Sequence, residues 1–207
     1  MKILITFLSI CVLTTFHAKA INLQLHNRPI DSTMAKSKKL KQLYILSTAS
    51  SIDASNIYKQ QFFDEFPSTF KQLDELYGYN YNTNISGPLG KLYTEHIELF
   101  NGLSNVNDTL YYKKIIAISI GGHWDADAVN VFQHGLRNRI LANPELALYI
   151  LKNMTDDKIK SFWFFYFDAA HPKKQIAKSL QRIKLSDPKI YSLMIAALDD
   201  VLKHSKE

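Results

Sequence analysis

The chain has 207 residues, with 25 lysines and arginines against 19 aspartates and glutamates, and a formal net charge of +6. That length is typical of one domain that buries a sizeable core. Its only cysteine is Cys11, inside a segment that we expect to be removed. A mature chain would then have no disulfide and no thiol chemistry.

The first twenty residues have the order of a secretory signal peptide. Lys2 precedes an apolar run over residues 3–16, and the small-x-small pattern Ala18-Lys19-Ala20 follows. The apolar run is too short for a comfortable membrane span. We therefore expect residues 1–20 to be cleaved and the product to be exported, to the periplasm or outside the cell, with no stable membrane anchor. Cleavage would lower the net charge from +6 to +4 by removing two lysines.

Nucleic-acid and nucleotide chemistry are not expected. The densest basic cluster, over residues 36–41, has no aromatic side chains between its lysines, as a nucleic-acid platform would need. The pair Gly121-Gly122 lacks both a Walker lysine and a G-x-G-x-x-G pattern, so a turn after a helix explains it more simply than anion binding. We expect no cofactor. Asn84, Asn107 and Asn153 lie in Asn-x-Ser/Thr sequons, which have no consequence if the compact leader is bacterial.

Prolines give the clearest structural signal. Five of them each precede an amphipathic or apolar segment, and proline suits the first turn of a helix because its missing N–H has no partner there. Two of the five follow good N-cap residues. The five are Pro67, Pro88, Pro144, Pro172 and Pro188, and the two caps are Asn143 and Asp187.

Apolar residues at spacings of three and four predict tandem helices joined by short connections. We expect residues 21–33 to be extended or disordered and residues 34–207 to form a single helical domain. The predicted helices cover 34–46, 53–66, 67–77, 88–100, 108–120, 125–142, 144–153, 156–168, 172–185 and 188–203.

The predicted fold class is therefore all-α, either a multi-helix bundle or an irregular stack of helix pairs. An α/β fold is the alternative. In it the isoleucine-rich residues 115–120 form a buried strand before the glycine turn, and residues 43–47 form a second strand. Short apolar runs do not distinguish strands from buried helices.

A tyrosine-rich and asparagine-rich segment over residues 77–82 is the best candidate contact loop. Tyrosine offers a large amphipathic contact area at low entropic cost, and asparagine adds adaptable hydrogen bonding. We expect Tyr77, Tyr79 and Tyr81 to contribute to binding, although a plain surface loop explains the composition equally well.

The segment Gly121–Asp127 contains the most distinctive string, and His123, Trp124 and Asp125 are its candidate binding residues. If the helix includes the whole string, His123, Asp127 and His134 lie on one stripe and are candidate metal ligands. No metalloenzyme signature has this spacing. A solvated polar face is the simpler interpretation, so we expect no metal site.

Residues 161–168 are aromatic on all sides, which is typical of a central, buried helix. Asp168 and His171 follow it and are candidates for an acid–base pair; helix-end capping is the simpler explanation. Trp163 and Phe164 are candidates to line a pocket for an apolar ligand.

Three functions fit these patterns. The leading one is an exported, non-enzymatic binding protein whose partner is another protein. An immunity or inhibitor-type protein is its most specific form, by analogy of size and compartment. The second is a metal-dependent or acid–base hydrolase that uses the His and Asp groups named above. The third is a carrier of an apolar ligand.

Overall fold

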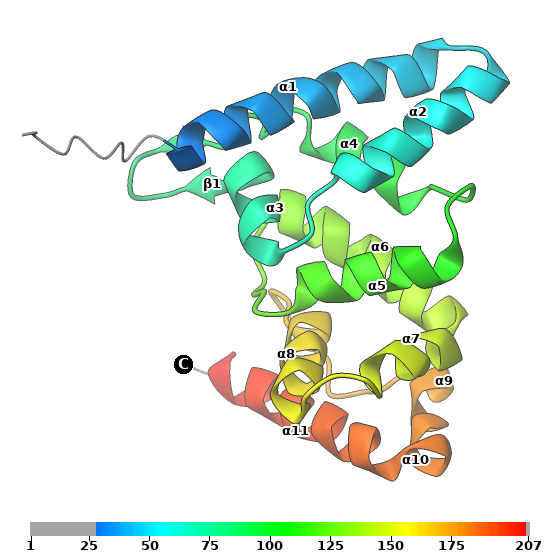
Figure 1. The fold of residues 1–207 in the computed structure, drawn as a ribbon. Coiled ribbons are helices and arrows are strands. Elements are labelled where there is room, and N and C mark those ends of the chain that lie inside the picture. The colour runs from blue at the N-terminus through cyan, green and yellow to red at the C-terminus, as the bar shows by residue number, and fades with distance from the viewer. Residues whose placement is uncertain (1–27, 206–207) are drawn as a thin grey trace, which may run out of the picture.

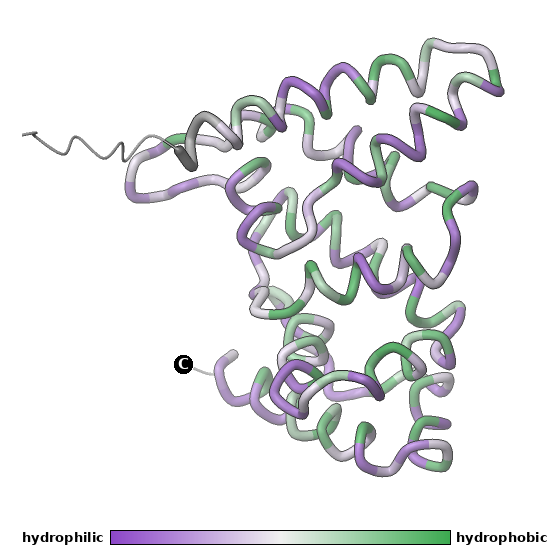
Figure 2. Tube along the Cα trace, viewed as in Figure 1, coloured by the Kyte–Doolittle hydropathy of each residue, from purple (hydrophilic) through white to green (hydrophobic). Residues whose placement is uncertain are grey.

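Helices make up most of the computed structural model, which describes residues 28–205. They lie in three tiers, and the chain passes from one tier to the next in sequence order (Figure 1). Hydrophobic and hydrophilic residues alternate along most of them (Figure 2), as expected for amphipathic helices. None of the helices within the described residues is long and apolar enough to cross a membrane.

The first tier is an antiparallel helical hairpin of α1 (Arg28–Ala49) and α2 (Ile52–Glu65). Within it the Ser55 hydroxyl donates to the Ser47 carbonyl at 2.5 Å, and Lys39 and Glu65 form a salt bridge of 2.6 Å. Residues 28–33, which we expected to be extended, are helical instead. The missing N–H of a proline at position 29 costs nothing in a first turn. Residues 1–27, including the predicted signal peptide, lie outside the described residues.

The second and third tiers contain the remaining elements. The second consists of α3 (Phe70–Tyr77), β1 (Tyr79–Asn80), β2 (Ile85–Ser86), α4 (Tyr93–Asn101), α5 (Asp108–Ser119) and α6 (Ala128–Ala142). The third consists of α7 (Pro144–Leu151), α8 (Asp156–Phe167), α9 (Lys178–Gln181), α10 (Ile183–Ser186) and α11 (Pro188–His204). Helix α11 packs along α8, and α4 packs on α6.

The all-α prediction is confirmed, and the α/β alternative is wrong. Residues 115–119 belong to α5 and residue 120 caps it, while residues 43–47 belong to α1. The Asn107 side chain accepts from the Leu110 N–H at 3.2 Å and caps α5, so its isoleucines are buried as a helical face. Within residues 28–205 the sheet consists of β1 and β2 alone, paired antiparallel.

Two of the five proline predictions are confirmed. Pro144 and Pro188 occupy the first turns of α7 and α11. The side chains of Asn143 and Asp187 accept from backbone N–H groups at 3.1 and 3.0 Å and cap these helices.

The other three prolines lie outside helices, Pro88 in a turn and Pro67 and Pro172 in irregular segments, because a fixed φ suits these conformations as well as a helix. Helix α3 begins at Phe70, capped by Thr69, and α4 begins only at Tyr93. After Pro172 no helix begins until Lys178, so the predicted helix 172–185 is two short helices, α9 and α10.

The core is one cluster of buried side chains that includes residues from all three tiers. Phe66 and Phe100 stack at 3.9 Å between ring centroids and join α2 to α4. In α8, Phe162, Trp163, Phe165 and Tyr166 are buried, which confirms the prediction of a central aromatic helix.

A tight turn after α5 depends on two glycines. Gly121 has a φ of 77°, which favours glycine. Gly122 is buried, and a Cβ there would lie 2.6 Å from Phe165 Cδ2 and 2.8 Å from Phe70 Cδ2. Both N–H groups are already paired: Gly121 donates to Ser161 Oγ and Gly122 to the Ser119 carbonyl. The turn is thus explained by chain geometry.

Gly122→Ala should lower the free energy of unfolding by about 1–3 kcal/mol, because the new methyl group overpacks two phenyl rings. Urea denaturation measures the change. Gly102→Ala is the matched control, since Gly102 is exposed and the nearest atom to its Cβ lies at 3.3 Å. Equal losses for the two variants would contradict the account of the turn.

Candidate functional site

The tyrosine-rich segment folds into a small β-hairpin. Tyr79 pairs with Ser86 and Asn80 with Ile85. The Asn80 side chain accepts from the N–H groups of Asn82 and Thr83 at 3.0 and 3.1 Å, which closes the turn. Every residue from 79 to 86 is exposed. The hairpin therefore presents its side chains to solvent instead of packing them in the core.

The segment between α5 and α6 is anchored by Asp168, the residue that follows the last turn of α8. The Trp124 N–H donates to Asp168 Oδ2 at 2.5 Å. Asp127 occupies the N-cap position of α6 without a side-chain capping hydrogen bond, and has a φ of 58° and a ψ of −112°, a conformation that is rare for a non-glycine residue. Because this backbone is not helical, α6 begins at Ala128 and not at Asp125 as predicted.

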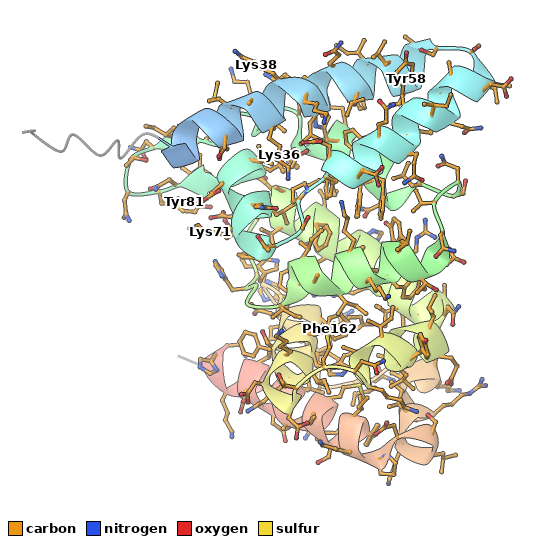
Figure 3. All side chains as sticks on the ribbon, in the orientation of Figure 1. Lys36, Lys38, Tyr58, Lys71, Tyr81 and Phe162 are labelled. Carbon is orange, nitrogen blue, oxygen red and sulfur yellow. The ribbon has the colours of Figure 1, made fainter. Side chains whose placement is uncertain are left out.

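The hairpin meets the segment before α6 through a phenol–carboxylate contact, in which Tyr81 Oη donates to Asp125 Oδ1 at 3.3 Å. A second contact of this kind comes from the start of α4, where Tyr93 Oη donates to Asp127 Oδ1 at 3.4 Å. Figure 3 shows Tyr81 at the edge of the molecule beside α3. Two regions that the sequence identified separately thus form one surface.

A hollow of about 700 Å³ lies between them, and we call it the hairpin hollow. Its lining contains three carboxylates and, among the described residues that form it, no lysine or arginine. The residues of interest in its wall are Asp74 and Glu75 from α3, Tyr79 and Tyr81 from the hairpin, and His123, Trp124 and Asp125 from the segment before α6.

One of the three carboxylates has a basic partner outside the lining: Glu75 Oε1 lies 3.7 Å from Lys71 Nζ, one turn earlier on α3, whereas no salt bridge joins Asp74 or Asp125 to a basic side chain within residues 28–205. Partial burial raises the pKa of Asp74, the Asp125 carboxylate raises it further, and His123 opposes the rise. The Asp125 carboxylate also raises the pKa of Tyr81, so that phenol stays a neutral donor. A local excess of negative charge in a basic protein favours a cationic ligand group.

Five of the six predicted binding residues lie in the hairpin hollow, and Tyr77 does not. Its side chain is buried behind the hairpin, and its hydroxyl lies 3.1 Å from His96 Nδ1. Burial raises the pKa of Tyr77. Tyr77 differs from the other five because it ends α3, whose other apolar side chains also face the core.

The three candidate metal ligands are not brought together. His123 precedes the start of α6 and packs on Phe70 with ring centroids 5.0 Å apart, whereas His134 is exposed on α6 beside Asn138. In the part of the chain that the structure describes, no group of three His, Cys, Asp or Glu side chains is placed to hold a metal ion.

Asp168 and His171 also separate. Asp168 is half-buried and positions Trp124, while His171 is exposed and lines a different hollow of about 620 Å³. No hydrogen bond joins the two side chains within residues 28–205. Trp163 is fully buried and cannot line a pocket. Tyr166 and Phe167 line the second hollow in its place.

Some residues of these sites carry no recognisable sequence signal. Asp74 and Glu75 look like the solvated face of a short helix, and Tyr93 looks like a core tyrosine. Only the fold places them beside the segment before α6.

No protein family model matches the chain, and comparison with curated proteins and with solved structures gives no match either. We therefore infer the function from the geometry of the chain itself.

His96 is a buried histidine beneath the hairpin hollow. Its ring lies 4.9 Å from that of Tyr44 and 5.5 Å from that of Phe62, and Tyr77 is its hydrogen-bond partner. Burial lowers the pKa of His96 to about 4. His96 is thus a hydrogen-bonded residue of the core.

The protein should lose stability as the pH falls from 6.5 to 4. The unfolded chain binds a proton at His96 below its usual pKa of 6.5, whereas the folded chain binds it only near 4, so protonation favours unfolding in that window. The loss attributable to His96 is about 2–3 kcal/mol. Urea titrations of wild type and His96→Gln across this range measure it. The variant should have a flatter pH profile, and His134→Gln, at an exposed site, should not. Parallel profiles for wild type and His96→Gln would contradict the assignment.

Proposed function

We propose that this protein is an exported, non-enzymatic binding protein that holds a basic segment of another protein in the hairpin hollow. The observation that carries the proposal is the meeting of an exposed tyrosine hairpin with three carboxylates around a hollow whose described lining has no lysine or arginine. Such a surface attracts lysine and arginine side chains by charge and by contact with tyrosine rings.

The exposure of the hairpin supports a macromolecular partner. Tyr81 is 66% exposed and Ile85 is 64% exposed, although both side chains are large and apolar in part. Tyrosine is enriched among the residues that dominate binding energies at protein interfaces. The tight turn at Asn80 and the contact of Tyr81 with Asp125 fix the hairpin before a partner arrives, which lowers the entropic cost of binding.

An immunity or inhibitor-type role is the most specific form of this proposal. The signal peptide predicted from the sequence would place the protein outside the cytoplasm. A rigid acidic surface there would block a toxin or an envelope enzyme by occupying a basic segment of it. Support for this form comes from the acidic lining of the hairpin hollow and from the expected compartment.

A photo-crosslinking amino acid at Tyr81 should capture one discrete protein from an extracytoplasmic fraction, through a peptide rich in lysine or arginine. Tyr149 is the matched control position, because it is 63% exposed and lies on α7. Excess wild-type protein should compete for the adduct. Equal labelling from both positions would contradict the proposal.

With the captured partner purified, Tyr81→Ala should weaken binding at least tenfold, a loss of about 1.4 kcal/mol or more. Asp125→Asn should weaken it and reduce its dependence on salt, because one screened charge is removed. Tyr149→Ala should leave the dissociation constant unchanged. Calorimetry at two salt concentrations measures all four proteins. An unchanged dissociation constant for Tyr81→Ala would overturn the proposal.

A further inference from the structure

A second hollow lies between α6, α8 and the segment that leads into α9, and its charged lining residues are basic where those of the hairpin hollow are acidic. It has a volume of about 620 Å³, within the usual range for small-molecule sites. Tyr166, Phe167, Ile176 and Leu180 form its apolar wall. We call it the C-terminal hollow.

Arg137 lies in the wall of this hollow, half-buried and without a carboxylate partner. Its Nε donates to the Tyr166 carbonyl at 2.9 Å, and its Nη2 donates to the Asp168 carbonyl at 2.7 Å. Nη2 also lies 3.4 Å from the Gln133 side-chain oxygen. Its other terminal nitrogen, Nη1, makes no hydrogen bond within residues 28–205.

The guanidinium is held in place but not neutralised. Desolvation lowers the pKa of Arg137, and the Asp168 carboxylate compensates only in part. The side chain of Asp168 is occupied by the Trp124 N–H, and no salt bridge joins it to Arg137 in the described part of the chain. A half-buried cation in this state is stabilised by any anion that reaches it.

The other charged residues of the lining are also basic. Lys173 and Lys178 line the hollow and are exposed, as is His171, and among the described lining residues none is acidic. Arg137 and the two lysines thus lie beside an apolar wall, and a ligand that contacts both must have a negative group joined to an apolar body.

We propose that the C-terminal hollow binds a single-chain amphiphile with a carboxylate head, that is, a fatty-acid anion. The carboxylate receives hydrogen bonds from Arg137 Nη1, and the chain lies along Tyr166, Phe167 and Leu180. His171, Lys173 and Lys178 lie at the rim of the hollow, beside the carboxylate head. This site shares no lining residue with the hairpin hollow, so the fatty-acid proposal does not depend on the protein partner proposed there.

Calorimetric titration with decanoate, decanol and decyltrimethylammonium tests the proposal, because the three probes share one chain length and differ in head group. Decanoate should bind with a stoichiometry of one and at least tenfold more tightly than decanol, and the cationic probe should not bind. Equal affinity for decanoate and decanol, or no saturable decanoate binding, would overturn the proposal.

Variants locate the site. Arg137→Gln should weaken decanoate binding at least tenfold and decanol binding much less. If Arg137→Gln does not fold, the rim variant Lys173→Gln/Lys178→Gln, at exposed positions, should still weaken decanoate binding several-fold. Ala177→Trp, which narrows the hollow without touching Arg137, should weaken both probes, whereas Ala35→Trp on the exposed face of α1 should weaken neither. Decanoate binding that survives both the charge changes and Ala177→Trp would place the ligand elsewhere and contradict the proposal.

Discussion

The C-terminal end of α8 is fastened to α6, and both hollows depend on this contact. The last carbonyls of a helix have no partner within the helix and need one from elsewhere. Gln133, fully buried on α6, donates to the Phe165 carbonyl at 2.6 Å and to the Asp168 carbonyl at 3.0 Å. Arg137, one turn further along α6, donates to the Tyr166 and Asp168 carbonyls. Two side chains of one helix thus complete the end of another.

This contact places surfaces of opposite charge near one helix end. The Asp168 backbone is fixed by α6, and its carboxylate fixes the Trp124 N–H and so one wall of the hairpin hollow. Arg137, held by the same carbonyls, forms a wall of the C-terminal hollow. The desolvation of the half-buried guanidinium is offset in part by its hydrogen bonds to the carbonyls at the end of α8. The result is an acidic, tyrosine-rich surface and a basic, apolar one in a single chain.

Local chemistry made the fold class and several elements predictable from the sequence. Asn143-Pro144 and Asp187-Pro188 encode a cap and a first turn in adjacent residues, and no tertiary contact is needed to interpret them. The aromatic run of α8 has no polar face, so burial was the natural expectation. Most of the predicted binding residues that line the hairpin hollow were also recognisable from the sequence. They belong to two segments of unusual composition, the tyrosine-rich and asparagine-rich turn and the string before α6.

The failures come from tertiary constraints. Helix α6 begins only at Ala128, after the unusual backbone of Asp127, so the helix does not include the string 121–127 and the candidate metal ligands do not share a helical stripe. Tyr77 is buried because α3 packs on its apolar face. Residues 172–177 form a wall of the C-terminal hollow in place of a helix. Arg137 could not be singled out, because its environment is made of carbonyls from α8.

Amide hydrogen exchange of a Gln133→Met variant tests the role of the α6–α8 contact most directly. Methionine keeps the size of the side chain but removes its donor. The account predicts faster exchange in both residues 121–127 and residues 169–177, with α1 and α2 unchanged. Asn138→Met, at an exposed position of the same helix, should change neither segment. Unchanged exchange in both segments of Gln133→Met, or an equal rise across the whole chain, would contradict the claim that this contact supports both hollows.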